Sequence, residues 1–125
     1  AQIRRFHVQG WTNLGDWSLA HDDFAQASTA YAKALATDPT LDRAGIFFGL
    51  GKALFVLDRP KEALPYLERV GERLDPPLVA ETALYLGQIH AAQGDMKKAD
   101  HYFDTVRLLA PEIGARLPPR TEGKR

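Results

Sequence analysis

One stretch decides the fold: residues 11–39 read WTNLGDWSLAHDDFAQASTAYAKALATDP. Its Gly15 returns as Gly51 and again as Gly87, each time preceded by leucine, at a constant spacing of 36 residues. A repeat of this length is one supersecondary unit that cannot bury its own apolar face, so successive units stack on one another. The sequence therefore predicts three repeated units rather than one irregular domain.

Each unit divides into two helical segments. Apolar residues recur at three- and four-residue steps over residues 8–21 and again over 24–36, which is the periodicity of amphipathic helices. Inside a helix, glycine lowers the stability of the helix by up to about 1 kcal/mol relative to alanine. A glycine nevertheless recurs at the same position of every first helix. We therefore expect two helices to approach closely at these glycines. The residues expected to fill the facing positions are Ala27, Ala63 and Ala99.

Aspartates and prolines mark the predicted helix boundaries. An aspartate oxygen can accept hydrogen bonds from the first backbone N–H groups of each second helix. The candidate caps are Asp22, Asp58 and Asp95. Proline lacks a donor and restricts the residue before it, so it should end each second helix. The prolines at these places are Pro39, Pro76 and Pro111. The pair Asp75-Pro76 also suits the cap and the first residue of the helix that follows. Pro65 lies inside the second helix of the middle unit, where we expect a slight bend.

The composition excludes several classes of function. Lys and Arg total 16 and Asp and Glu total 16, so the formal net charge is zero and the broad basic field that nucleic-acid binding needs is missing. The chain has no cysteine, which excludes disulfides, thiolate metal sites and cysteine nucleophiles. Its longest apolar stretch, residues 44–57, is shorter than the roughly 20 residues of a membrane span, so we expect no membrane insertion.

The histidines do not form a catalytic or metal-binding pattern. His21 precedes Asp22 and Asp23, but the three fall in a predicted turn, where capping and solvation explain them better than a metal does. His90 occupies a phase that is buried between paired helices, so we expect a core histidine with its hydrogen bonds satisfied. No two histidines have the three- or four-residue spacing of a helical metal site. We therefore predict no enzyme, no cofactor and no metal.

Six phase-matched positions and a closing proline carry a family resemblance. They are Trp11, Leu14, Gly15, Ala27, Tyr31, Ala34 and Pro39 in the first unit, Phe47, Leu50, Gly51, Ala63, Leu67, Val70 and Pro76 in the second, and Ala83, Leu86, Gly87, Ala99, Phe103, Val106 and Pro111 in the third. The combination resembles the tetratricopeptide repeat over roughly residues 8 to 113. Two features depart from that family. The aromatic residue expected late in the first helix is replaced by Ser18, Leu54 and His90, and the unit is two residues longer than the usual ~34.

The resemblance implies an all-α fold, a right-handed α-solenoid of three antiparallel helix pairs. The ranges we predict are 1–7 for an N-terminal extension or the remnant of a preceding helix, 8–41, 42–77 and 78–113 for the three units, and 114–125 for a polar, proline-containing tail. Beyond the third unit the chain is too short for a full solvating helix, so Leu108 and Leu109 should remain exposed.

In this family the first helices line a concave groove in which partner peptides bind. The groove residues implied here are Thr12, Asp16, Leu19, Phe48, Lys52, Phe55, Leu84, Tyr85 and Gln88. Phe48, Phe55 and Leu84 are the expected apolar anchors. The resemblance thus implies a non-catalytic adaptor or scaffold that binds a protein or peptide partner. The alternative is a structural module that self-associates through its exposed terminal helices, or a fragment of a longer repeat array in a larger complex.

Neither the compartment nor the beginning of the chain is decided by the sequence. The absence of cysteine suits a soluble protein of the cytoplasm or the bacterial periplasm. The chain begins with Ala1, and its only methionine is Met96, so we expect a processed start: a cleaved export signal, a removed tag or an excised domain.

Overall fold

The computed structural model describes residues 2–120, apart from the side chains of residues 2 and 4. Within these residues the secondary structure is entirely helical, as predicted. The helices are α1 (Gln2–Ala20), α2 (Phe24–Thr37), α3 (Ala44–Val56), α4 (Pro60–Glu68), α5 (Pro76–Ala92), α6 (Met96–Leu109) and α7 (Pro111–Gly114). Residues 121–125 of the predicted tail lie outside the described part of the chain.

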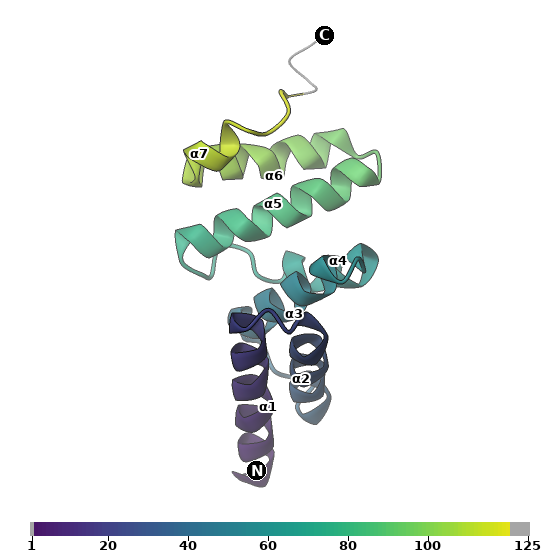
Figure 1. Cartoon of the computed structure of the whole chain (residues 1–125), viewed down its shortest axis with the longest axis vertical. Helices are drawn as coiled ribbons and strands as arrows, with labels where there is room; N and C mark the ends of the chain where they lie inside the picture. Colours follow the sequence, from purple (N-terminus) through teal and green to yellow (C-terminus); the bar gives the residue numbers. More distant parts are fainter. Residues whose placement is uncertain (1, 121–125) are drawn as a thin grey trace. The chain divides into compact units, whose positions relative to one another are not determined.

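The chain forms two compact units, one ending at Arg69 and the other beginning at Val70. In the first unit α2 packs against both α1 and α3, and α4 packs against α3. In the second unit α6 packs against α5 and carries the short α7. Figure 1 shows α1 beside α2 and α5 beside α6, each pair running antiparallel. The predicted helix pairs are therefore present in both units.

The repeated glycines lie where a large side chain of the second helix meets the first. A Cβ atom on Gly15 would stand 2.6 Å from Tyr31 Cε1, and one on Gly51 would stand 2.6 Å from Leu67 Cδ2. The close approach predicted at the glycines is confirmed, but the nearest side chains are not those of the predicted alanines. Helical side chains lean toward the N-terminus of their helix, so the residue one turn beyond the expected alanine reaches the glycine. These partners are Tyr31, Leu67 and Phe103 in place of Ala27, Ala63 and Ala99.

The turns within the helix pairs show which aspartates act as caps. Asp23 accepts a hydrogen bond from the Gln26 backbone N–H at 3.1 Å, and Asp95 accepts one from Lys98 at 3.2 Å. The predicted caps Asp22 and Asp58 are wrong, because both residues adopt the left-handed conformation, with φ of 58° and 62°. This conformation places them in the turn itself, one residue before the N-cap.

The helix α4 is shorter than the repeat predicts. It ends at Glu68, well before Pro76, and Pro76 instead opens α5 as its first residue. Pro65 lies inside α4 as expected, and it deprives the helix of one backbone donor. Pro39 and Pro111 do follow the ends of α2 and α6. Two of the three predicted proline stops are therefore confirmed and the stop at Pro76 is wrong. The prediction that Pro76 follows the N-cap Asp75 as the first residue of the next helix is confirmed.

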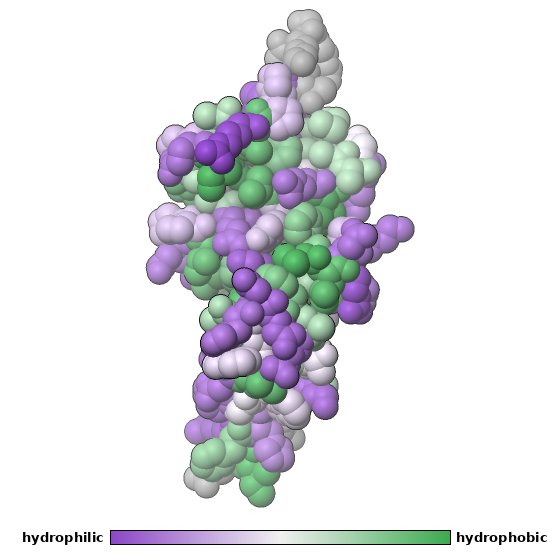
Figure 2. Space-filling model, viewed as in Figure 1, coloured by the Kyte–Doolittle hydropathy of each residue, from purple (hydrophilic) through white to green (hydrophobic). Residues whose placement is uncertain are grey.

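Both ends of the chain expose apolar side chains. Residues 2–7 continue directly into α1, so they form the first turns of this helix rather than a separate preceding one. Ile3 and Phe6 are exposed there, and Figure 2 shows hydrophobic surface at the N-terminal end of α1. Leu108 and Leu109 are exposed as predicted. In the described part of the chain, no helix combines the length and hydropathy that crossing a membrane requires.

Candidate functional site

The predicted groove residues of α1 differ in exposure. Asp16 is exposed, and its Oδ1 accepts a hydrogen bond from the Tyr31 hydroxyl at 2.6 Å. Leu19 is half-buried. Thr12 is buried, and its hydroxyl donates to the Val8 carbonyl at 2.7 Å, one helical turn back. The side of α1 with Asp16 and Leu19 therefore offers one fixed carboxylate and one partly accessible apolar side chain.

The predicted groove residues of α3 form a layered cluster. Phe48 is only 6% exposed, so its ring is not the accessible anchor that the sequence suggested. Lys52 is half-buried and places its ammonium nitrogen 5.8 Å from the centre of the Phe48 ring. Phe55, two turns after Phe48, is half-buried. Phe48 thus supports this surface from below, whereas Lys52 and Phe55 present it to solvent.

The predicted groove residues of α5 lie in the second unit. Leu84 and Tyr85 are half-buried and Gln88 is exposed. The Tyr85 hydroxyl donates to the Glu81 carboxylate one turn earlier in the helix. Burial, with this hydrogen bond as the second cause, raises the pKa of Tyr85 well above its ordinary value. The hydrogen bond to Glu81 therefore orients the Tyr85 hydroxyl.

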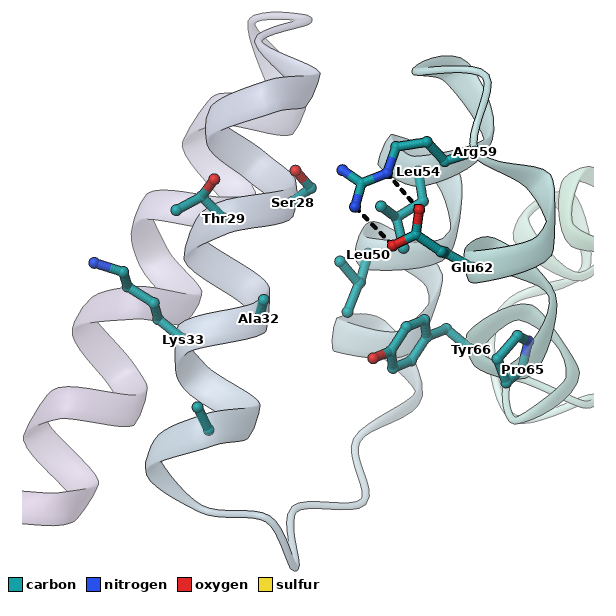
Figure 3. A pocket seen from close by; sticks show the side chains of 11 residues that line it. Ser28, Thr29, Ala32, Lys33, Leu50, Leu54, Arg59, Glu62, Pro65 and Tyr66 are labelled. Atoms are coloured by element: carbon teal, nitrogen blue, oxygen red, sulfur yellow. Dashed lines mark hydrogen bonds and ion pairs between the residues drawn. The ribbon is translucent and has the colours of Figure 1, made fainter.

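A cavity that the sequence analysis missed lies on another side of the first unit, between α2, α3 and α4. Its volume is about 670 Å³, within the range of small-ligand and peptide side-chain pockets. In Figure 3, Leu50 and Tyr66 face Ala32 across the cavity. Arg59 and Glu62 form a two-pronged ion pair of 2.6 and 2.7 Å at one end. The cavity is thus an apolar trough with a charged pair at its edge.

A sequence signal for this cavity exists. Ser28, Ala32 and Ala36 recur at four-residue steps along α2, which places three small side chains on one stripe of the helix. Small residues leave a trough where the opposing helix, here α4 with Tyr66, is too far away to fill it. The stripe alone does not show that a neighbouring helix stands far enough away to leave the trough open.

The histidines and acidic residues do not assemble a metal site in the described residues. His21 is exposed, stacks on Trp17 with ring centres 3.9 Å apart, and has its Nδ1 2.8 Å from the Trp17 carbonyl. His90 is buried and stacks on Tyr102 at 5.6 Å. Neither of its ring nitrogens has a hydrogen-bond partner among the described residues. The prediction of a core histidine with satisfied hydrogen bonds is therefore wrong in its second half.

Comparison with protein families gives a match over most of the chain. The family model described as tetratricopeptide repeat matches residues 12–77 and 59–107. A search of the curated proteins found no significant match.

Solved structures share the fold. The MamA protein is 24% identical with a TM-score of 0.65, over 84% of this chain and 55% of that one. YrrB, described as a TPR protein with an unusual peptide-binding site, is 26% identical with a TM-score of 0.69, over 83% and 52%. The N-terminal domain of stress-induced protein-1 (STI-1) from C. elegans is 20% identical with a TM-score of 0.67, over 93% and 95%. The chain therefore spans about half the length of MamA and YrrB.

Proposed function

Since the chain belongs to the tetratricopeptide repeat family, we propose that it is a non-catalytic interaction module that holds a peptide segment of a partner protein against its first helices. The family membership supports an interaction role in general. The choice of the first helices rests on the side chains that α1 and α3 present. Fold alone does not assign a function, so these side chains have to carry the proposal.

The observation that carries the proposal is the combination of apolar and charged groups on α1 and α3, two helices that contact each other. Leu19 and Phe55 are half-buried, so each is held by the protein and still offers apolar surface. Asp16 is fixed by the Tyr31 hydroxyl, and Lys52 is supported by the Phe48 ring. Apolar anchors beside oriented charges of both signs suit an extended peptide with an apolar residue between polar neighbours.

The test begins with peptides selected on this chain from a random display library. Their dissociation constants are then measured by calorimetry for the native chain and for the double variant Leu19→Ser/Phe55→Ser, which changes the two half-buried apolar side chains of α1 and α3. The matched control is Leu108→Ser/Leu109→Ser, which removes two exposed leucines elsewhere. Phe48 is left unchanged, because it is buried and its replacement would destabilise the fold. We expect the groove variant to lose binding by at least about tenfold, or 1.4 kcal/mol, and the control to retain it.

The cavity between α2, α3 and α4 is the rival binding face. Ala32→Arg would fill the trough, because Ala32 is exposed and lines it. Ala25→Arg adds the same side chain to the same helix outside the cavity and is the matched control. Loss of peptide binding in Ala32→Arg alone would contradict the proposed face and assign the peptide to the cavity. Failure to select any peptide would contradict the proposed function.

A further inference from the structure

The exposed face of α1 carries a symmetric pattern of side chains. Ile3 and Phe6 precede Gly10 by seven and four residues, and Leu14 and Trp17 follow it by four and seven. These spacings place all five residues on one stripe of the helix. Their exposed fractions are 72%, 75%, 36% and 55% for Ile3, Phe6, Leu14 and Trp17. The stripe, residues 3, 6, 10, 14 and 17, is therefore a large apolar surface with a glycine at its centre.

The equivalent face of α3 shows what such a stripe does inside the protein. The positions 36 residues after Gly10 and Leu14 are Ile46 and Leu50, and both are 2% exposed. The helix α3 packs there against α2, whose Tyr31 ring meets Gly49. The corresponding face of α1 has no such neighbour among the described residues. An exposed apolar helix face of this kind marks an interaction site.

The stripe of α1 does not have the shape that receives a helix like α2. Where α3 has Gly49, α1 has Asn13, whose side chain accepts a hydrogen bond from Gln9 at 2.7 Å. Where α3 has the fully buried Ala53, α1 has Trp17. Both differences add bulk, and Asn13 does so at the position where α3 receives the Tyr31 ring of α2. In α1 the glycine of this face is Gly10 instead, and a Cβ added there would meet nothing within 4 Å.

We propose that the stripe of α1 binds the same stripe of a second copy of this chain, with the two helices antiparallel about a two-fold axis at Gly10. This arrangement places Ile3 opposite Trp17 of the second copy and Phe6 in the same layer as Leu14 of the second copy. A two-fold axis at Gly10 pairs each residue with the residue equally far on the other side of Gly10, so apolar positions of one copy meet apolar positions of the other, as an isologous interface requires. The two Gly10 residues let the backbones approach at the axis.

The area of the stripe sets the strength of this dimer. Large aromatic side chains bury about 150–250 Å² each when they are covered, and the four side chains of the stripe are between a third and three quarters exposed. Two copies would therefore bury roughly 1,000 Å² in total, at the lower end for specific protein interfaces. The dimer is accordingly a weak one that forms and dissociates with concentration. It uses the side of α1 opposite to Thr12 and Leu19, so it is independent of the proposed peptide site.

Sedimentation equilibrium tests the dimer with the chain as it stands. We expect the average mass to rise from monomer to dimer over about a hundredfold range of concentration. Gly10→Leu adds apolar surface but fills the axis, so it should weaken dimerisation by at least about tenfold. The matched control Gly45→Leu changes a second exposed glycine with open space around it and should leave the dimer unchanged. Circular dichroism verifies that both variants remain helical.

Two outcomes of this experiment would overturn the proposal. A native chain that stays monomeric at every concentration would assign the stripe to a helix of another segment or another protein. A Gly10→Leu variant that dimerises as tightly as the native chain would show non-specific apolar association.

Single cysteines test the orientation of the two helices, because the chain has none of its own. Under oxidising conditions Gly10→Cys should link to itself, since the two positions meet at the axis. Ile3→Cys should not, because an antiparallel pair places the two copies of residue 3 at opposite ends of the interface. Self-linking of Ile3→Cys at the same rate would indicate parallel helices and overturn the two-fold arrangement.

Discussion

The helices α2 and α4 occupy the same place in successive repeats, and they differ in length, capping and packing. The helix α2 has 14 residues and α4 has 9. Asp23 caps α2 through its side chain, whereas the N-cap of α4 is Arg59 and makes no such bond. The ring of Tyr31 in α2 lies against Gly15 and Gly49 of two different helices, and Leu67 in α4 lies against Gly51 of one. Position in the repeat sets the packing partner, while local residues set how much helix forms.

Replacing Tyr31 of α2 and Leu67 of α4 by alanine should show the largest difference in stability between the two helices. Tyr31→Ala should cost about 3–5 kcal/mol of unfolding free energy, because it empties a space between two helices and leaves the Asp16 hydrogen bond unmade. Leu67→Ala should cost less, because leucine is smaller than tyrosine and its loss leaves no hydrogen bond unmade. Urea unfolding followed by circular dichroism measures both. A larger loss for Leu67→Ala would contradict the role given to the ring of Tyr31.

Removing Pro65 should make α4 more like α2. Pro65→Ala restores a backbone donor inside the helix, and the gain exceeds the loss of proline's restriction of the unfolded chain, so we expect about 1–2 kcal/mol of stabilisation. Thermal unfolding and the helical signal in circular dichroism provide the measurement. A loss of stability would instead mean that contacts of the Pro65 ring beside the cavity outweigh the missing hydrogen bond.

High pH should separate α2 from α4, because Tyr31 can lose a proton and Leu67 cannot. Burial, and next the hydrogen bond to Asp16, raises the pKa of Tyr31 well above the ordinary value of about 10. Above about pH 10 the unfolded chain therefore loses this proton before the folded one does, and stability falls by up to about 1.4 kcal/mol per pH unit.

Below about pH 10 this contribution of Tyr31 is fully present. Urea midpoints measured from about pH 8 to about pH 11 should show a decline above pH 10 that is shallower in Tyr31→Phe. Tyr85, whose pKa is also raised, should account for part of the decline that remains. An equally steep decline in Tyr31→Phe would contradict the prediction.

The smallest expected effect concerns the caps. Asp23→Ala should destabilise the chain by about 1 kcal/mol, because a backbone N–H at the start of α2 loses its acceptor. Arg59→Ala should cost less, since it removes only an exposed ion pair with Glu62. The two variants are compared by urea unfolding at the same ionic strength. Equal losses would mean that capping does not distinguish the two helices.

The all-α fold, the helix pairs and the phase of the close contacts could be predicted from sequence, because the glycines recur at one spacing and helical periodicity is a local property. The partners of the glycines could not. Ala27 and Tyr31 both lie on the inner face of α2, and only the lean of the side chains decides which one reaches Gly15. The early end of α4 was also missed, although Gly71, three residues after Glu68 and with a φ of 57°, is the kind of residue that ends a helix.

The candidate site was predictable to a smaller extent. Their positions within the repeat placed Asp16, Lys52 and Phe55 on first helices, where the structure shows them exposed or half-buried. It did not distinguish Phe48, which is buried, from Phe55, because the exposure of a side chain depends on how closely the neighbouring helices pack. The cavity beside Ala32 was missed for the same reason, since its volume depends on the distance between α2 and α4.

The tight turns at residues 21–23, 57–59 and 93–95 also bear on how the chain folds. They bring the strongest contacts, those of α1 with α2 and of α5 with α6, between segments that are neighbours in the sequence. Proteins dominated by such local contacts fold in about microseconds to milliseconds. A ribosome adds only about 5–20 residues per second. The first helix pair should therefore be formed before the second unit has been synthesised.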